Sequence, residues 1–269
     1  MIASRPHLLI TGASSGIGAA LVEWALAQGW QVSGLARRED RLQDLQQRLD
    51  PAGAHFSYYL ADVLSQESLD RAVASAVAQR GPLRGVVANA GRGVDGELSD
   101  LSAADVAMVY DCNVVGVQRT LRASRPHMGA GSAMVCVSSV AAFLPIPRMG
   151  AYCATKHALE AWVAAARMEL RDADIRILSC CPGTVATEFF ASAPKPGAVW
   201  DWRPGSPLRP EQVARAILRQ VRRRRPRRII LPWFARLAAV LYAISPGFGE
   251  WLMGRALRRM RQRENPPSV

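Results

Sequence analysis

Short apolar runs alternate with longer amphipathic segments along most of the chain. Six runs of four to six residues are rich in apolar and β-branched side chains, which is typical of buried strands. The segments between them carry apolar residues at three- and four-residue spacing, which indicates helices. The predicted strands are His7–Ile10, Gln31–Ala36, Phe56–Leu60, Gly85–Ala88, Ala133–Ser138 and Ile175–Cys180, and the predicted helices are Ile17–Gln28, Arg38–Leu49, Glu67–Gln79, Ala103–Leu121 and Ala151–Leu170.

This alternation predicts an α/β fold class with a doubly wound sheet. The stretch Met134–Val137 is entirely apolar, which indicates a strand buried on both faces. Buried strands that alternate with helices form parallel βαβ units. We expect one domain over residues 1–231, with a mostly parallel, seven-stranded sheet that ends in a strand at Ile229–Leu231. Residues 232–269 are expected to form a C-terminal amphipathic, basic extension.

Composition excludes several classes of protein. The chain has 269 residues, 49% hydrophobic and 21% charged, with ordinary glycine and proline usage, so a disordered or fibrous chain is excluded. No run of about 20 apolar residues is present, and the polar start before His7 is too short for a secretory signal. The five cysteines lack metal-ligand spacing, so we expect reduced thiols, no metal and a cytoplasmic protein.

Positive charge is concentrated near the C-terminus. Fourteen arginines and one glutamate lie within residues 215–263, a formal charge of +13 against +12 for the whole chain. The run Arg222–Arg228 resembles a nucleic-acid patch, but no interleaved aromatic residues accompany it. A solvated helix end is the favoured interpretation, because basic residues suit the C-terminus of a helix. Nucleic-acid binding through this tail is kept as an alternative.

A glycine-rich turn follows the first predicted strand. Thr11–Gly18 has the spacing G-x3-G-x-G and leads into the first predicted helix. Glycines allow a diphosphate to approach the backbone closely, and a helix N-terminus supplies N–H donors. A tight strand–helix connection is the alternative. The position at the first βα junction of a parallel sheet favours dinucleotide binding.

The end of the second strand indicates which dinucleotide is bound. NAD sites carry Asp or Glu here to bind the ribose 2′-OH, whereas Leu35–Arg38 contains no carboxylate. The guanidiniums of Arg37 and Arg38 suit a 2′-phosphate, so we expect NADP(H), with NAD(H) as the weaker candidate. These arginines would otherwise only begin a solvated helix. Asp62, before Val63, is a candidate acceptor for the adenine amine or a helix cap.

Four residues suggest the chemistry. Tyr152 and Lys156 are four apart in a helical stretch and share one face. Lys156 is one of only two lysines beside 32 arginines, and a compact ammonium beside a phenol lowers the phenol pKa. Ser139 ends the fifth strand, at the edge where such sheets bind ligands. Asn113 lies in the preceding helix. Each residue alone has a structural explanation: a surface pair for Tyr152 and Lys156, a helix cap for Ser139, and a solvated helix face for Asn113. Their combination favours a catalytic site.

The sequence resembles the short-chain dehydrogenases/reductases over about residues 6–230. One departure is Ala88, where the family most often has Asn. The motifs occur in the family's order: Thr11–Gly18, Ala88–Gly91, Asn113 with Val114-x-Gly116, Ser138-Ser139, Tyr152-x-x-x-Lys156, and Pro182–Val185 followed by Thr187.

The resemblance implies a Rossmann fold, an enzyme and a Ser–Tyr–Lys–Asn catalytic tetrad. Ser139 and Tyr152 would bind the substrate oxygen, and Tyr152 would transfer its proton. Lys156 would lower the Tyr152 pKa and bind the nicotinamide ribose, and Asn113 would fix a water for proton return. Hydride would pass between nicotinamide and a carbonyl or secondary alcohol carbon without a metal. The cofactor contacts would be Gly12, Ser14, Ser15, Gly16, Ile17, Gly18, Arg37, Arg38, Asp62, Val63, Asn89, Ala90, Gly91, Tyr152, Lys156, Pro182, Gly183, Val185 and Thr187.

The sequence defines the substrate pocket less closely than the cofactor and catalytic residues. In the family, the segment at about residues 184–210 closes over the substrate, and Gly93–Leu98 and Ala141–Met149 would complete the pocket. The aromatic residues Phe189, Phe190, Trp200 and Trp202 suit an apolar substrate, or they only attach this lid to the core. Family members that act on lipids often carry hydrophobic C-terminal additions, which favours a lipophilic carbonyl or alcohol.

The C-terminal extension leaves the partners open. Apolar residues from Trp233 to Ile244 recur at helical spacing, and arginines surround Trp251 and Leu257. Such basic amphipathic helices suit an anionic membrane surface, a subunit interface or a cover over the pocket. The family implies a homodimer or homotetramer. A non-catalytic dinucleotide-binding regulator is the alternative function, although a complete tetrad argues against it.

Overall fold

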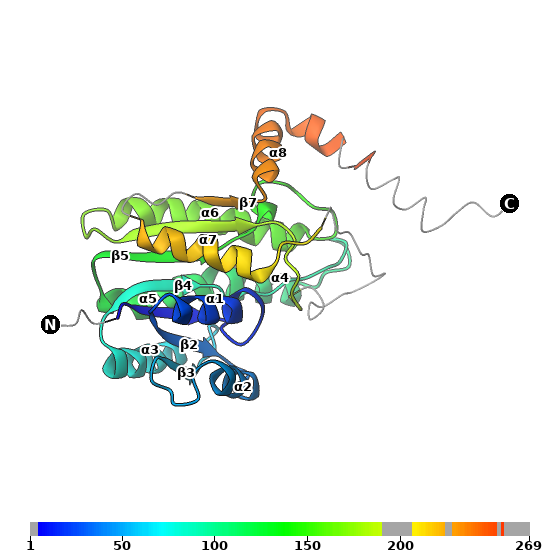
Figure 1. Ribbon diagram of the computed structural model, residues 1–269. Helices are drawn as coiled ribbons and strands as arrows, with labels where there is room; N and C mark the ends of the chain where they lie inside the picture. Colours follow the sequence, from blue (N-terminus) through cyan, green and yellow to red (C-terminus); the bar gives the residue numbers. More distant parts are fainter. Residues whose placement is uncertain (1–4, 190–205, 224–227, 252–253, 256–269) are drawn as a thin grey trace.

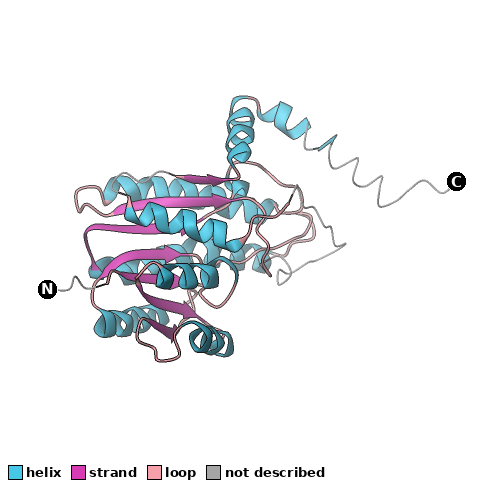
Figure 2. Cartoon of the chain, in the orientation of Figure 1, coloured by secondary structure: helices cyan, strands magenta, loops and turns pink. Residues whose placement is uncertain are grey.

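Strand–helix alternation produces a single parallel sheet between two layers of helices. The computed structural model describes residues 5–189, 206–223, 228–251 and 254–255. Their seven strands follow the order β3-β2-β1-β4-β5-β6-β7, and every pair is parallel. Figures 1 and 2 show helices on both faces of this sheet. The predicted doubly wound α/β fold is confirmed.

Most element boundaries lie within a few residues of the prediction. The strands are β1 His7–Thr11, β2 Gln31–Ala36, β3 Phe56–Leu60, β4 Leu83–Ala88, β5 Met128–Val137, β6 Arg176–Pro182 and β7 Ile229–Leu231. The α-helices are α1 Gly16–Ala27, α2 Glu39–Leu49, α3 Gln66–Arg80, α4 Ala103–Tyr110, α5 Gly116–Ser124, α6 Gly150–Glu169, α7 Pro210–Arg222 and α8 Trp233–Ile244. Short 3-10 turns occupy Arg125–His127 and Val140–Ala142.

Two predicted elements differ in the structure. The predicted helix Ala103–Leu121 is divided into α4 and α5 by a π-helical turn at Asp111–Val115. Periodicity does not reveal this turn, because both halves keep helical spacing. β5 begins at Met128 rather than Ala133, and it ends before Ser138, which lies outside the strand. Gly131, with φ +76°, lies within this additional stretch of β5.

The core has two halves, one on each face of the sheet. On β1, Leu8 and Ile10 point to the layer of α1, α2 and α7, and Leu9 points to the layer of α3, α5 and α6. All three side chains are fully buried. Successive side chains of a strand point to opposite faces, so consecutive residues are all buried when helices cover both faces. The sheet therefore depends on apolar residues at consecutive positions, which explains its continuous apolar strands.

The division of the chain at residue 231 stays a prediction. β7 is the last strand of the described sheet, and α8 follows it directly (Figure 1). Part of the predicted extension, residues 252–253 and 256–269, lies outside the described residues.

Leu8→Ala should lower the free energy of unfolding by about 2–5 kcal/mol, because a fully buried leucine leaves a cavity in the central strand. The matched control is Leu60→Ala at the end of β3, where the side chain is half exposed, and it should cost less than about 1 kcal/mol. Urea unfolding followed by tryptophan fluorescence measures both. Equal losses would contradict close packing of β1 against the layer of α1, α2 and α7.

Candidate active site

A cleft crosses the carboxyl edge of the sheet. Strand order reverses direction between β1 and β4, and crevices form at such switch points because the adjoining helices leave in opposite directions. The cleft has a volume of about 410 Å³ and is lined by both halves of the chain. It brings the predicted dinucleotide and chemical ends of the site together.

The glycine-rich turn is built by close backbone contact. Gly12 adopts φ +68°, a conformation that favours glycine. A Cβ at Gly18 would lie 2.1 Å from the Gly12 carbonyl oxygen, so only glycine permits α1 to begin here. The amide of Asn89 donates to the carbonyl oxygens of Thr11 and Gly12, at 3.1 Å each. These bonds join the end of β4 to the turn after β1.

The start of α1 fits a dinucleotide diphosphate. Ser15 is the N-cap of α1, but its side chain makes no capping hydrogen bond. The first N–H groups of a helix then have no partner within the helix, and they attract an anion. Ser15, Gly16 and Ile17 all line the cleft. The residues present therefore fit the phosphate group that the sequence motif predicts.

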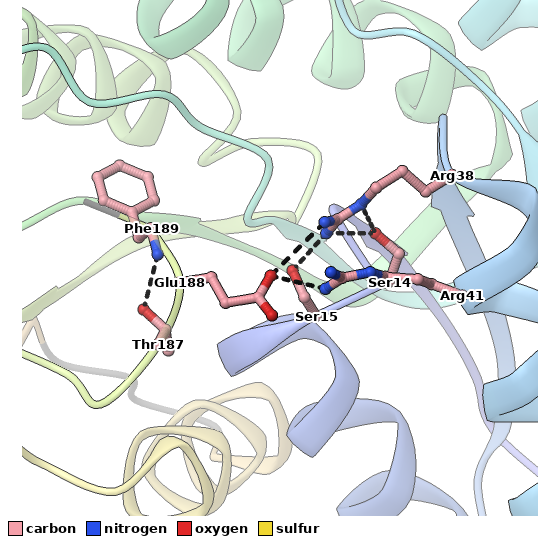
Figure 3. A network of polar contacts seen from close by, with 7 residues as sticks. All are labelled: Ser14, Ser15, Arg38, Arg41, Thr187, Glu188 and Phe189. Atoms are coloured by element: carbon pink, nitrogen blue, oxygen red, sulfur yellow. Dashed lines mark hydrogen bonds and ion pairs between the residues drawn. The ribbon is translucent and has the colours of Figure 1, made fainter. Parts of the chain in front are cut away.

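Arg38 connects the end of β2 to this turn. Its guanidinium donates to the hydroxyl of Ser15 at 2.7 Å and to the hydroxyl of Ser14 at 3.1 Å (Figure 3). Arg37 lies beside Asp62 with 3.8 Å between charged atoms, and both side chains are substantially exposed. The geometry concentrates positive charge beside the start of α1.

Two residues that sequence reasoning missed complete this charged cluster. Arg41 donates to the carboxylate of Glu188 at 2.6 Å, and Arg38 lies 3.7 Å from the same oxygen (Figure 3). The Arg41 hydrogen bond and charge lower the pKa of Glu188. Arg41 was detectable, since it lies in the first turn of α2, three residues after Arg38, the N-cap of that helix. Glu188 was not, because it is 147 residues away from Arg41.

Asp62 has a local role in the structure. Its carboxylate accepts a hydrogen bond from the backbone N–H of Leu64 at 3.0 Å, which stabilises the turn before α3. The residue also lines the cleft. Turn formation and an adenine contact remain compatible, since a carboxylate has several acceptor positions.

Ser139 and Tyr152 lie at the opposite end of the cleft. The Ser139 hydroxyl accepts from the backbone N–H of Ala141 at 3.1 Å, at the end of β5. Tyr152 is buried, and the edge of its ring meets Phe189 with 5.8 Å between ring centroids. Burial raises the pKa of the Tyr152 phenol, and its hydrogen bond with Ser139 opposes that shift. Burial outweighs this hydrogen bond, so the pKa of Tyr152 is raised overall, whereas Lys156 is expected to lower it.

Lys156 is buried one helical turn after Tyr152. Its ammonium Nζ donates to the carbonyl oxygen of Val137 at 3.0 Å and lies 5.6 Å from the centroid of the Tyr152 ring. Burial lowers the Lys156 pKa to about 8, because the charged form is poorly solvated there. The ammonium and the phenol thus share one buried space, and burial moves their pKa values apart, raising that of the phenol and lowering that of the ammonium.

Asn113 lies in the π-helical turn and is fully buried. Its amide accepts from the backbone N–H of Arg92 at 2.8 Å and donates to the Arg92 carbonyl at 2.9 Å. A second donation reaches the hydroxyl of Thr155 at 3.1 Å, between Tyr152 and Lys156 in α6. Asn113 therefore joins the loop after β4 to the helix that carries the chemical groups.

The structure gathers almost all predicted site residues. Every predicted cofactor residue except Gly18 lines the cleft, and so do Ser139, Tyr152 and Lys156. Gly18 and Asn113 lie behind its wall. Phe189 lines the cleft too, whereas Phe190, Trp200 and Trp202 lie outside the described residues.

The two ends of the predicted lid are joined. Val185 and Leu208 form an isolated parallel bridge, and the backbone N–H of Ala186 donates to the Leu208 carbonyl at 2.9 Å. Thr187 packs where a Cβ on Gly16 would fall, 2.9 Å from its methyl group. The described base of the lid thus closes onto the glycine-rich turn. Of the other predicted pocket loops, Gly93 lines the cleft and Ala141–Met149 does not.

Described arginines of the basic run bind the body of the domain. Arg222 donates to the carbonyl oxygen of Gln28 at 3.0 Å, just after α1. Arg228 pairs with the buried carboxylate of Glu160 at 3.0 Å. These contacts favour a structural role for the two ends of the run over a nucleic-acid surface; residues 224–227 lie outside the described part of the chain.

Comparison with known proteins agrees with this geometry. A family model described as short chain dehydrogenase matches residues 6–196. The uncharacterized oxidoreductase YbbO of Escherichia coli K12 is 38% identical over 190 residues, which cover 69% of this chain and 68% of that protein.

Solved structures share the fold. An alcohol dehydrogenase from Thermococcus sibiricus complexed with 5-hydroxy-NADP is 29% identical, with a TM-score of 0.75 over 85% of this chain and 95% of that one. A short-chain dehydrogenase/reductase from Burkholderia phymatum in complex with NAD is 25% identical, with a TM-score of 0.81 over 91% and 95% of the two chains. This chain therefore belongs to the short-chain dehydrogenase/reductase family, as an NAD(P)-dependent oxidoreductase that acts on CH–OH or C=O groups.

Proposed function

We propose that this enzyme uses NADP(H) in preference to NAD(H). The observation that supports the proposal is the position of Arg38, which follows the end of β2. Its guanidinium hydrogen-bonds the hydroxyls of Ser14 and Ser15 in the glycine-rich turn. An NAD site has a carboxylate at this place, where it would repel a 2′-phosphate. A guanidinium instead offers a planar fork of donors that matches phosphate oxygens. Arg37 and Arg41 lie nearby and pair with Asp62 and Glu188 in exposed positions, where water weakens each pair.

The glycine-rich turn, Asp62, Val63, Asn89–Gly91 and the Pro182–Thr187 segment would hold the rest of the cofactor. When bound, the nicotinamide supplies or accepts the hydride. The chain's own residues then handle the substrate oxygen and its proton.

Tyr152 is proposed as the general acid in carbonyl reduction. A raised pKa keeps its phenol protonated at neutral pH, so it can donate a proton to a carbonyl oxygen as negative charge develops there. The Ser139 hydroxyl, which interacts with Tyr152, would give the same oxygen a second hydrogen bond. In alcohol oxidation the roles reverse, and the phenolate accepts the proton.

Lys156 and Asn113 would support that proton transfer. The Lys156 ammonium, 5.6 Å from the Tyr152 ring centroid, stabilises the phenolate that remains after donation. Asn113 acts as a positioning residue, since its amide ties α6 to the loop at Arg92. Its role in holding a water for proton return, which the family implies, stays a prediction.

The substrate is proposed to be a lipophilic carbonyl or secondary alcohol. The apolar side chains that line the cleft include Phe189, Met108 and Cys112. The Phe189 edge against the Tyr152 ring puts an apolar surface beside the proton donor. A homodimer or homotetramer stays a prediction from the family.

Tyr152→Phe should lower kcat for reduction of a reactive lipophilic ketone by about 100- to 10,000-fold, because it removes the proton donor alone. NADPH binding, followed by quenching of tryptophan fluorescence, should persist. Tyr58→Phe on β3 is the matched control and should keep full activity. Persisting turnover in Tyr152→Phe would refute the mechanism, and a wild-type protein that binds NADPH without any turnover would favour a non-catalytic regulator.

Replacing Arg37 by Asp and Arg38 by Ser should reverse the cofactor preference. The ratio of kcat/KM with NADPH to that with NADH should fall roughly 100-fold. A fall of this size corresponds to the loss of two charge-assisted hydrogen bonds, each worth about 1.5 kcal/mol. Arg71→Asp in α3, exposed and paired with Glu67, is the control for added negative charge. An unchanged ratio in the double variant would exclude a 2′-phosphate site at these arginines.

The rate of carbonyl reduction should fall as the pH rises through about 8. Below this value Lys156 is charged and stabilises the developing phenolate; above it the amine is neutral. The measurement is kcat/KM for ketone reduction against pH, with tryptophan fluorescence at each pH to verify folding. A profile that stays flat to pH about 10, the ordinary range of lysine, would contradict the buried ammonium.

A further inference from the structure

The helix α8 presents a large apolar surface to solvent. Trp233 is 78% exposed and Ile244 is 76% exposed, values typical of polar surface residues. In Figure 1 the helix projects from the domain beside β7. The exposed apolar side chains of α8 and of the helical segment 246–251 that follows it, which we call the α8 stripe, are Trp233, Phe234, Leu237, Val240, Leu241, Ile244, Phe248 and Trp251.

The α8 stripe lies on the side of the helix that faces away from the domain. At about 100° per residue, its six residues within α8 fall in an arc of about 120°. Ala235, the buried residue of this helix, lies roughly opposite the centre of that arc. The helix is thus attached to the domain by its small residues and turns its large ones outward. Such a continuous apolar face indicates a binding surface.

Positive charge borders the stripe. Arg236 is adjacent to it on α8, and the Arg255 guanidinium lies 5.6 Å from the centroid of the Trp251 ring. Within its described residues, 232–251 and 254–255, the extension has two arginines, Arg236 and Arg255, and one acidic residue, Glu250. Glu250 accepts a hydrogen bond from Tyr242 at 3.3 Å. The surface therefore combines apolar side chains, aromatic rings and an excess of arginine.

We propose that the α8 stripe docks the enzyme onto an anionic lipid surface. Interfacial helices have this composition: the apolar face enters the acyl boundary, and arginines meet lipid phosphates. Trp favours the level of the headgroups, and Phe and Leu are typical of the apolar face of such helices. At 12 residues, α8 is roughly 18 Å long, too short to cross a bilayer core of about 30 Å, so it would lie on the surface. Within the described residues no helix is both long and apolar enough to span a membrane.

Charge disfavours a second copy of the chain as the occupant. In a two-fold dimer the same patch meets itself, so the bordering arginines would face one another. Among the described residues of the extension, the single carboxylate of Glu250 cannot balance Arg236 and Arg255 in each copy. An anionic bilayer supplies the missing negative charge together with an apolar interior.

Docking through α8 would hold the cleft close to the lipid. The helix begins at Trp233, and the preceding Pro232 contacts the position of a Cβ on Gly183 at 3.3 Å. Gly183 lines the cleft and bonds through its backbone N–H to the Leu231 carbonyl at 2.6 Å. A rigid, short connection thus joins the lipid-binding surface to the wall of the cleft, whatever the substrate is.

Vesicle cosedimentation of the full-length protein tests the proposal. The probes are vesicles of phosphatidylcholine alone and vesicles of phosphatidylcholine and phosphatidylglycerol in a ratio of about three to one. The wild type should bind the anionic vesicles at least about tenfold more tightly. The variant Leu237→Gln/Leu241→Gln/Ile244→Gln should lose that binding and keep its fold, because all three side chains are exposed.

Two further variants separate the contributions. Leu60→Gln/Met168→Gln removes exposed apolar side chains elsewhere on the domain and should bind as the wild type does. Arg236→Gln/Arg255→Gln should weaken binding to anionic vesicles several-fold and reduce its salt dependence. Thermal unfolding and dehydrogenase activity without vesicles confirm that each variant folds.

Three results would overturn the proposal. The first is no binding to either vesicle, and the second is equal binding by the wild type and the triple glutamine variant. The third is a wild-type oligomer, measured by light scattering, that dissociates in the triple variant while vesicle binding is absent. That last outcome would assign the α8 stripe to a second copy of the chain.

Discussion

The site depends on how closely α1 approaches the end of β1. A hydrogen atom is the largest substituent that position 18 accepts, since a Cβ there would overlap the Gly12 carbonyl oxygen. This contact sets the direction in which α1 leaves the sheet, and the Asn89 amide fixes the same turn to β4. Because β1 and β4 border the switch point, the cleft exists only where these two contacts hold the backbone.

The same cleft contains two kinds of electrostatic environment. At the end near β2, arginines and Glu188 lie in exposed positions, where water weakens each pair and charge acts mainly by attracting an anion. At the end near α6, Tyr152 and Lys156 are buried, so desolvation dominates their pKa values. An exposed end suits the reversible binding of a charged ligand, and a dry end suits proton transfer at a single oxygen.

Beyond β7 the chain follows a different physical rule. The sheet buries apolar side chains at consecutive positions between two layers of helices, whereas α8 leaves its large apolar side chains in solvent. A small-residue face at Ala235 attaches the helix to the domain. An apolar surface of this kind indicates a binding partner outside the domain. The neighbouring arginines favour a partner with negative charge.

Much of the protein was determined by the sequence alone. Continuous apolar runs and segments at helical spacing predicted the succession of strands and helices along the chain, because burial on both faces of a sheet requires apolar residues at consecutive positions. The chemical residues were also detectable, since Tyr152 and Lys156 share one helix and Ser139 ends a strand. Glycine spacing located the dinucleotide end for the same reason: its contacts are local.

Only the tertiary structure decided the features that join distant segments. The bond between Arg41 and Glu188 depends on how the lid base crosses the cleft, which no local pattern records. The π-helical turn at Asn113 keeps helical spacing on both sides, so periodicity cannot reveal it. The pKa of Tyr152 rises because burial outweighs its neighbours, and burial is a property of the packed fold. The outward orientation of α8 has the same origin: an amphipathic sequence defines an apolar face, and packing decides which way that face points.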